Sequence, residues 1–144
     1  MFIGEYRHSI DPKRRLSIPA KFRKELGKHA VLTKGLDSSL VLYPIEEWRR
    51  LAERLANLPM GQEKMRQFVR SRFADAAEVS FDSLGRILIP DVLAEYAALS
   101  KNIVVAGLYT RIELWDEKRW NAYKQKAEKS APDVAEQLGE EGVF

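Results

Sequence analysis

The first ten residues alternate between two sets of side chains, which predicts a strand with one buried face. One face would carry Phe2, Tyr6, His8 and Ile10, and the other Ile3, Glu5, Arg7 and Ser9. Asp11-Pro12 then predicts a turn, because proline presets φ and aspartate can bond to its own backbone. A returning strand is expected at 16–18.

A short basic helix is predicted over Ala20–Leu26, because Pro19 suits the first helical position and Gly27 suits the residue after the last turn. Apolar runs at 30–33 and 40–43 predict a pair of strands. The same order of elements recurs further along the chain. It comprises a strand ending at Phe81, a turn at 83–85, a strand at 87–89, a helix from Pro90 to about Leu99, and strands at 103–106 and 112–115.

Helical spacing of apolar residues predicts three further helices, at 48–58, at 65–73 and around Trp120 and Tyr123. The aromatic residues on these helices keep the helical period, so packing in a core is favoured over base stacking or a ligand pocket. From about Pro132 the chain is acidic and loses its periodicity, which predicts a flexible acidic tail over residues 132–144.

One motif occurs twice, at residues 9–19 and again 71 positions later at residues 80–90. In each copy an Asp precedes an Arg by four residues, and an apolar run that ends in Pro follows. With one extra residue in the second copy, Gly35-Leu36 also matches Gly107-Leu108. This self-similarity predicts a duplicated β-rich unit, with a first repeat over residues 1–75 and a second over residues 76–131.

Repeats of about 70 residues have small cores, so the two halves are expected to stabilise each other or further copies of the chain. The chain has no Cys and only two His, which disfavours disulfides and a zinc or other metal site. It begins with no signal-peptide pattern and has no apolar stretch long enough to span a membrane. A cytoplasmic protein is expected.

Charge is distributed unevenly along the chain. Residues 1–75 contain 16 Lys/Arg and 9 Asp/Glu, whereas residues 76–144 contain 8 and 12. Seven basic residues and one acid lie between Lys13 and Lys28, around the first motif. A basic surface centred on that motif predicts binding to nucleic acid. The chain has no phosphate-binding glycine loop and no nucleophile with partners at motif spacing, so it is not expected to be an enzyme or to need a cofactor.

The spacing of the motif suggests separate roles for its acid and its base. Asp11 and Asp82 are expected to fix their turns by accepting backbone N–H bonds, rather than to act as paired catalytic carboxylates. An Arg that points outward would bind phosphate or guanine, and one that points inward would pair with its Asp. For Arg86 both alternatives stay open.

Nucleic-acid contact is favoured for Arg15, because two further cations, Lys13 and Arg14, lie beside it. The basic residues around this loop are candidates for secondary phosphate contacts: Arg7, His8 and Lys21.

These features resemble the MraZ family, bacterial transcriptional regulators that are similar to AbrB-type regulators and MazE-type antitoxins. The resemblance rests on the two Asp-x-x-x-Arg motifs, the opening Met-Phe-x-Gly, and residues 15–19, 40–44 and 113–116, and it runs from Met1 to about Tyr123. It implies an α+β, β-rich, swapped-hairpin fold in which two tandem half-units form one barrel-like module with flanking helices. It also implies a ring-shaped homo-oligomer that binds double-stranded DNA, in the cytoplasm at the nucleoid. The DNA sites implied are direct repeats in the promoter of the division and cell-wall gene cluster.

The resemblance places the DNA contact on the basic loop of the first motif, here at Lys13 and Arg15, with Arg86 as the counterpart in the second motif. The family usually has Gly just before the first motif Arg, as Gly85 precedes Arg86, but position 14 is Arg. If the turn needs a positive φ there, Arg14 is strained by about 1 kcal/mol. Otherwise the turn type differs.

Two rival functions remain at this point. The first is an antitoxin-like protein-binding module, in which the helices at 48–58 and 65–73 or the tail would bind another protein. The second is an RNA-binding protein, which would need aromatic residues among the basic ones for base stacking. Only Phe22 lies in the basic run, and it is expected to face inward.

Overall fold

The computed structural model describes all 144 residues. The first half contains β1 (Phe2–Ser9), β2 (Arg15–Ser17), α1 (Ala20–Leu26), β3 (His29–Lys34), β4 (Leu40–Pro44), α2 (Ile45–Ala56) and α3 (Glu63–Ala74). The second half contains β5 (Ala77–Ser80), β6 (Arg86–Leu88), α4 (Asp91–Tyr96), β7 (Asn102–Tyr109), β8 (Ile112–Asp116) and α5 (Glu117–Glu140). Apart from α3, each element of the first half has a counterpart in the second, as the repeated motif predicts.

Strands from the two halves are interleaved within one antiparallel sheet. The strand order is β1-β7-β8-β4-β3-β5, and β2 pairs with β6 in a separate two-stranded ribbon. Thus β1 of the first half pairs with β7 of the second half, and β5 of the second half pairs with β3 of the first. Each half therefore gives its first strand to the other half, and the fold is an α+β, swapped-hairpin module.

The pairing registers reveal a pseudo-twofold axis between the halves. Leu16 is opposite Ile87 in the β2–β6 ribbon, and these two residues are each other's counterparts in the repeat. Val41 and Glu113, which are also counterparts, are opposite each other in the β4–β8 pair. The two halves therefore meet along two contacts between equivalent strands, which a duplicated sequence can form without a second copy of the chain.

The structure corrects one detail of the repeat alignment. In the first half β3 pairs with β4, and Leu32 is opposite Leu42. In the second half β7 pairs with β8, and Val105 is opposite Leu114. Because β4 and β8 are offset by 72 positions, β3 and β7 must be offset by 73. The predicted match of Gly35-Leu36 with Gly107-Leu108 is therefore wrong by one residue, because the two identical Gly-Leu pairs do not lie at equivalent positions of the strand pairing.

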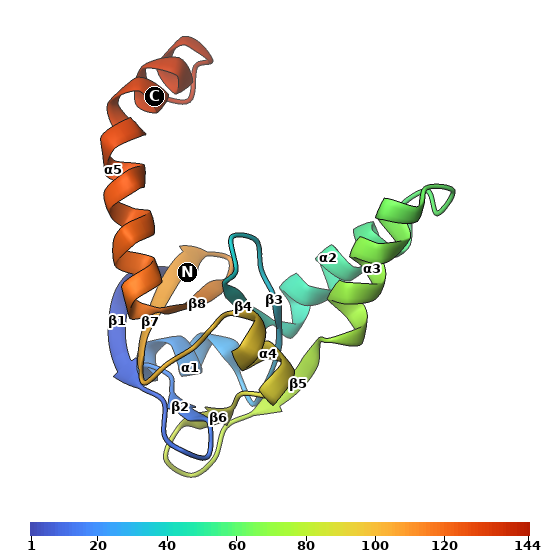
Figure 1. Ribbon diagram of the computed structural model, residues 1–144, viewed down its shortest axis with the longest axis vertical. Helices are drawn as coiled ribbons and strands as arrows, with labels where there is room; N and C mark the ends of the chain where they lie inside the picture. Colours follow the sequence, from blue (N-terminus) through green and yellow to red (C-terminus); the bar gives the residue numbers. More distant parts are fainter.

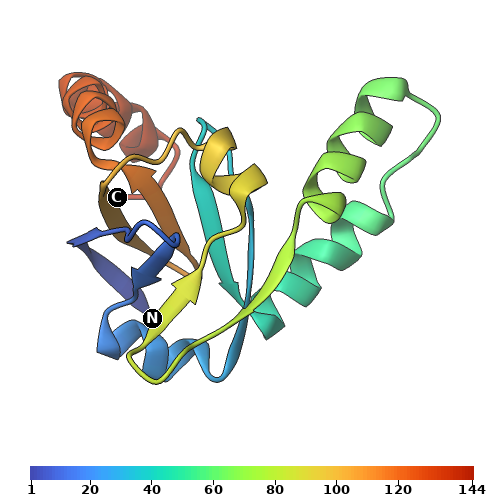
Figure 2. The ribbon, with the colours of Figure 1, turned by 60° about the horizontal axis from the view of Figure 1, so that its bottom comes forward.

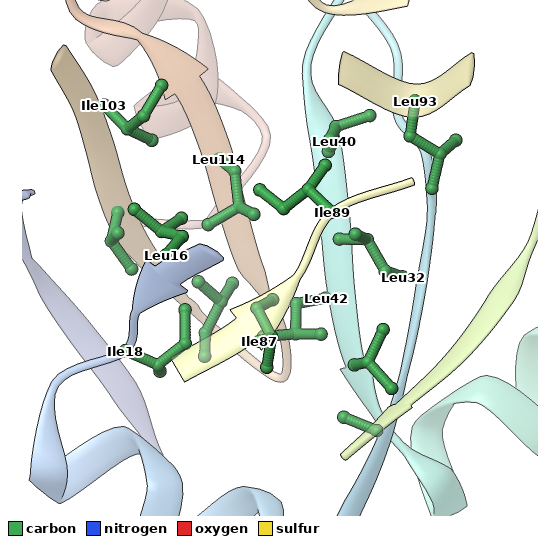
Figure 3. Packing of buried hydrophobic residues seen from close by; sticks show 14 of the residues in the cluster. Leu16, Ile18, Leu32, Leu40, Leu42, Ile87, Ile89, Leu93, Ile103 and Leu114 are labelled. Atoms are coloured by element: carbon green, nitrogen blue, oxygen red, sulfur yellow. The ribbon is translucent and has the colours of Figure 1, made fainter. Parts of the chain in front are cut away.

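One hydrophobic cluster fills the space between the sheet, the β2–β6 ribbon and the short helices. It contains 19 buried residues, drawn from both halves. Figure 3 shows Leu16 and Ile87 on the ribbon facing side chains of the sheet, among them Leu42 and Leu114. Phe22 on α1 packs edge-to-face against Phe2 with ring centroids 5.5 Å apart, so it faces inward as expected. Only a small second cluster, Val104, Ala106 and Trp115, belongs to one half alone.

The helices differ from the sequence expectation at two places. α4 ends at Tyr96 rather than near Leu99, because Ala98 has a φ of 50° that terminates the helix. α5 continues to Glu140, although a flexible tail was expected from about Pro132. Pro132 removes one backbone donor inside the helix, and Figure 1 shows that α5 bends in its distal part. The Ala, Glu, Gln and Leu residues after Pro132 are good helix formers. None of the five helices has the length and apolar character needed to cross a membrane.

Two helical projections leave the body on the side away from the β2–β6 ribbon. α2 and α3 form a hairpin on one side, and α5 extends from the other side (Figures 1 and 2). The prediction that the apolar stripe of α2 lies in a core is only partly right, because α2 has no fully buried residue. Trp48 does pack against Phe73 with ring centroids 5.8 Å apart, but the stripe stays open on its other side.

Candidate nucleic-acid interface

Two turns with the same hydrogen bonds project from one end of the molecule, at the bottom of Figure 1. In the first, Asp11 Oδ1 accepts bonds from the backbone N–H groups of Lys13 and Arg15, at 2.9 and 2.8 Å. In the second, Asp82 Oδ1 accepts bonds from Leu84 and Arg86, at 2.9 Å each. Both aspartates therefore fix a turn, as the sequence predicts. The antiparallel pairing of β2 with β6 places the two turns at opposite ends of the ribbon.

The motif arginines bind their own aspartates. Arg15 Nε lies 2.7 Å from Asp11 Oδ2, and Arg86 Nε lies 2.8 Å from Asp82 Oδ2. The Arg86 guanidinium also lies 3.9 Å from Asp11 Oδ2, so it contacts both turns. In Arg15 the Nε is held and neither Nη atom has a protein partner, which leaves a planar pair of donors at the molecular surface. The ion pair therefore orients this guanidinium without occupying the edge that binds phosphate or guanine.

The turn geometry is the same in both copies, although the residues differ. Arg14 has a φ of 61° and Gly85 has a φ of 74°. The carbonyl of Arg14 accepts a bond from Ile89 N at 2.9 Å, and that of Gly85 accepts one from Ile18 N at 3.2 Å. The position thus requires the left-handed conformation, and Arg14 is in it at a cost of about 1 kcal/mol.

The residues that pack beside Arg14 and Gly85 come from the opposite half, and they differ between the two turns. Arg14 Nε lies 2.8 Å from Asp91 Oδ1, at the start of α4. Across the pseudo-twofold axis, Arg23 of α1 lies over Gly85 and donates a bond to Ile18 O at 2.6 Å. A side chain at position 85 would collide with the Arg23 guanidinium. Each turn therefore has one arginine beside it. In the first copy this is Arg14 of the turn itself, and in the second copy it is Arg23 of α1.

Sequence reasoning did not find Asp91 or Arg23 as parts of the interface. A comparison of the two repeats could have pointed to these residues, because the repeats differ at each position. Arg14 corresponds to Gly85, Asp91 corresponds to Ala20, and Ala94 corresponds to Arg23. These three differences show that the cation beside each turn comes from different elements in the two copies: from the turn itself in the first copy, and from helix α1 in the second.

The predicted secondary contacts are spread over different surfaces. Arg7 faces α5, where its guanidinium lies 3.8 Å from Glu5 and 3.7 Å from Glu117, so its position does not support a phosphate contact. Lys21 lies on α1 with its Nζ 5.6 Å from the centroid of the Tyr6 ring, and its side chain is exposed. His8 is half-buried on β1, next to the first turn along the chain.

Basic residues of the first half also lie beside the second turn. Arg23, Lys28 and His29, at the end of α1 and the start of β3, line an open hollow together with Asp82 and the rest of that turn. The second motif has only one cation of its own, Arg86. The strand exchange therefore places first-half cations at both turns, although the sequence concentrates them in one half.

The turns hold their carboxylates in the ionised form. The backbone N–H of Arg15 is the main cause that lowers the pKa of Asp11, followed by the Arg15 side chain. The backbone N–H of Arg86 lowers the pKa of Asp82 in the same way. Both bonds need a carboxylate that accepts, so protonation would release the turn.

Acid is therefore expected to loosen both turns. A carboxyl whose pKa is lower in the folded than in the unfolded chain stabilises the fold fully above the unfolded value, about 3.9, and loses this effect as the pH falls through the folded value. We expect stability to be insensitive to these groups from pH 8 to about pH 5 and to fall below about pH 4. Asp11→Asn/Asp82→Asn should flatten that acid limb in urea unfolding. An unchanged limb would contradict the assignment.

Comparison with known proteins also finds two successive units in the chain. Residues 1–71 and residues 72–140 each match the model of one family, described as "MraZ protein, putative antitoxin-like". Two successive matches to one model agree with the duplicated motif and with the paired order of elements in the fold.

Full-length relatives share close to half of the sequence. The chain is 48% identical over 143 residues to a protein of Halothermothrix orenii named transcriptional regulator MraZ, a match that covers 99% of this chain and all of the relative. A protein of the same name from Acetivibrio thermocellus matches to the same extent. Another, from Heliobacterium modesticaldum, is 49% identical over 138 residues, or 96% of each chain.

Proposed function

The chain belongs to the MraZ family, and from this premise we propose that it is a transcriptional regulator that binds double-stranded DNA. The proposed contact surface is the end of the molecule that carries the two Asp-x-x-x-Arg turns. Lys13, Arg14 and Arg15 contact DNA from the first turn, and Arg86 from the second. The observation that carries the proposal is the Arg15 guanidinium, which Asp11 orients through Nε while both Nη atoms stay free.

The two turns would divide the work of recognition. Arg15 can donate two parallel bonds to the O6 and N7 atoms of a guanine, the commonest specific contact in the major groove. Lys13 is exposed and would contribute a phosphate contact without sequence information. The hollow lined by Arg23 and Lys28 adds cations beside the second turn, which extends the basic surface along the DNA.

Repetition would supply most of the affinity. One basic loop makes only a few phosphate contacts, so a single chain would bind weakly and with strong salt dependence. We propose a ring-shaped homo-oligomer that acts at the nucleoid and presents the loops to direct repeats in the promoter of the division and cell-wall gene cluster. Linked sites gain affinity through effective concentration, provided that their spacing matches that of the loops.

A salt-series titration tests this function. The purified protein is titrated by fluorescence anisotropy against a duplex with direct repeats and against a scrambled duplex of equal length and composition. We expect a clear preference for the repeats, and log K that falls steeply with log salt, by about 0.9 for each phosphate contact. Equal weak binding to both duplexes would overturn sequence-specific regulation and favour the protein-binding alternative.

Asp91 is expected to limit the affinity of the first turn. Its carboxylate holds Arg14 and would lie near the DNA phosphates, although its side chain is 81% exposed. Asp91→Asn should free Arg14, raise the affinity severalfold and steepen the salt dependence by about one phosphate contact per turn. Because exposed pairs contribute less than about 1 kcal/mol, folding should hardly change.

Glu95→Gln is the matched control for this variant. Glu95 lies on the same short helix, is exposed and has no ion pair. The substitution therefore removes an equal charge without changing the pair of Arg14 with Asp91. An Asp91→Asn protein that binds DNA no better than the Glu95→Gln protein would show that the pair with Arg14 does not limit binding.

A further inference from the structure

The β2–β6 ribbon has an outer face that points away from the core. Leu16 and Ile87 on its inner face are completely buried and face the sheet (Figure 3). Because side chains alternate along a strand, their neighbours in the two strands point outward: Arg15 and Ser17 of β2, and Arg86 and Leu88 of β6. This outer face lies between the two Asp-x-x-x-Arg turns, at the end of the molecule that is proposed to contact DNA (Figure 1).

The outer face departs from the pseudo-twofold symmetry at one pair of positions. Arg15 is opposite Leu88 in the ribbon, and Arg86 is opposite Ser17. The repeat makes the two arginines equivalent to each other, and it also makes Ser17 equivalent to Leu88. The arginine of the first motif therefore has an aliphatic neighbour across the ribbon, whereas the arginine of the second motif has a hydroxyl neighbour.

The aliphatic side chains near the first turn are open to solvent. Leu88 is 59% exposed. Val92, at the start of α4, is 47% exposed and stands where the first repeat has Lys21. It follows Asp91, which pairs with Arg14 of the first turn. The most basic turn thus has exposed apolar side chains near it, which contacts to phosphate alone would not use.

The major groove of DNA offers an apolar group that suits such a side chain. A two-stranded ribbon fits this groove, and thymine presents its C5-methyl group there beside the hydrogen-bonding edges of the bases. Residues opposite each other in an antiparallel pair have Cβ atoms about 4.5–5.5 Å apart. Successive base pairs are about 3.4 Å apart. A guanidinium at Arg15 and an aliphatic group at Leu88 can therefore meet neighbouring base pairs.

We propose that Leu88 contacts the C5-methyl group of a thymine next to the guanine that Arg15 binds. This inference rests on the proposed DNA contact of the first turn and adds a second base to its recognition. The bidentate arginine selects guanine through hydrogen bonds, and the leucine selects thymine by removing its methyl group from water. Each chain then reads at least two adjacent base pairs with the first turn.

The same contact gives the chain a direction on DNA. A surface with true twofold symmetry binds a site and its reverse equally well, so it matches palindromic sites. The proposed direct repeats instead require every copy to bind in one orientation. Because Ser17 lacks the aliphatic group of Leu88, the two ends of the ribbon present different groups to the bases. This difference favours one orientation of each copy on the DNA.

Uracil substitution tests the contact, because uracil differs from thymine only in lacking the C5-methyl group. The natural chain is titrated by fluorescence anisotropy against the repeat duplex and against the same duplex with every thymine replaced by uracil. We expect binding to the uracil duplex to be weaker by about fourfold or more, the factor expected for burial of one methyl group. Leu88→Ser should bind the two duplexes equally, within about 1.5-fold, because it has no aliphatic group to bury.

Two further variants control for other effects of the substitution. Ile3→Ser removes an aliphatic side chain that is 52% exposed, at the end of β1 away from the first turn, and should keep the preference for thymine. Leu88→Met keeps an apolar side chain at the contact and should keep most of that preference. Leu88→Ser is expected to fold, which a circular dichroism melt would check, because Leu88 is exposed and the equivalent position already carries Ser17.

The outcomes separate this inference from the proposed function. A natural chain that prefers the repeat duplex but binds its thymine and uracil forms equally would overturn the Leu88 contact alone. So would a folded Leu88→Ser protein that keeps the preference for thymine, or an Ile3→Ser protein that loses it. A natural chain that binds the repeat and scrambled duplexes equally would overturn sequence-specific DNA binding itself.

Discussion

Arg15→Ala is expected to abolish the preference for repeated DNA sites, with at least a hundredfold loss of affinity for the repeat duplex. Each bidentate arginine–guanine contact is worth about 1–3 kcal/mol of discrimination, and an oligomer loses one such contact in every subunit that touches DNA. The fold should survive, because Asp11 Oδ1 keeps its two backbone bonds without Arg15 Nε. Anisotropy with both duplexes, together with a circular dichroism melt, measures both effects.

Two further variants separate base contact, phosphate contact and turn geometry. Lys13→Ala should weaken binding to the repeat and scrambled duplexes by similar factors and reduce the salt slope, because it removes a phosphate contact only. Arg86→Ala removes the equivalent ion pair, from Asp82, in the second turn. If loss of the ion pair rather than loss of the DNA contact mattered, both Arg15→Ala and Arg86→Ala would melt earlier than the natural chain. Full affinity for the repeat duplex in Arg15→Ala would sink the assignment of this loop.

Local features of the fold could be predicted because short-range chemistry determines them. The bounds of α1 agree with the prediction residue for residue, since Pro19 and Gly27 limit the helix at its two ends. The two turns form as expected because an Asp with free backbone donors two and four residues ahead bonds to them in any surroundings. At position 14 the sequence left two alternatives, a strained Arg or a different turn type, and the positive φ of Arg14 supports the first.

Features that depend on distant partners could not be obtained in the same way. Alternation in residues 2–10 predicts a strand but does not say that its neighbour is β7, because periodicity identifies a buried face and not a partner. The pair of Arg14 with Asp91 depends on the ribbon that brings α4 to the first turn. The helical spacing of Trp48 and Leu51 predicts an apolar face, yet spacing cannot distinguish a core within one chain from a groove that is open to another.

Ile87→Ala is expected to lower the free energy of unfolding by about 2–5 kcal/mol, a large part of the stability of a domain of this size. Ile87 is completely buried and pairs with Leu16, also completely buried, at the pseudo-twofold axis. The cavity left by alanine would lie between the halves, where the two-stranded ribbon and the six-stranded sheet share one cluster. Urea unfolding measured by tryptophan fluorescence and by far-UV circular dichroism would give this value.

The same pair tests whether the two halves fold as one unit. Leu16→Ala should cost a similar amount, and the double variant should lose less than the sum, because the two side chains share one packing site. Leu84→Ala is the control, since Leu84 is 67% exposed on the second turn and should change stability by less than about 0.5 kcal/mol. Additive costs, or two transitions detected by the two probes, would contradict a single core. One coincident transition in all variants is the outcome expected of a chain in which each half completes the sheet of the other.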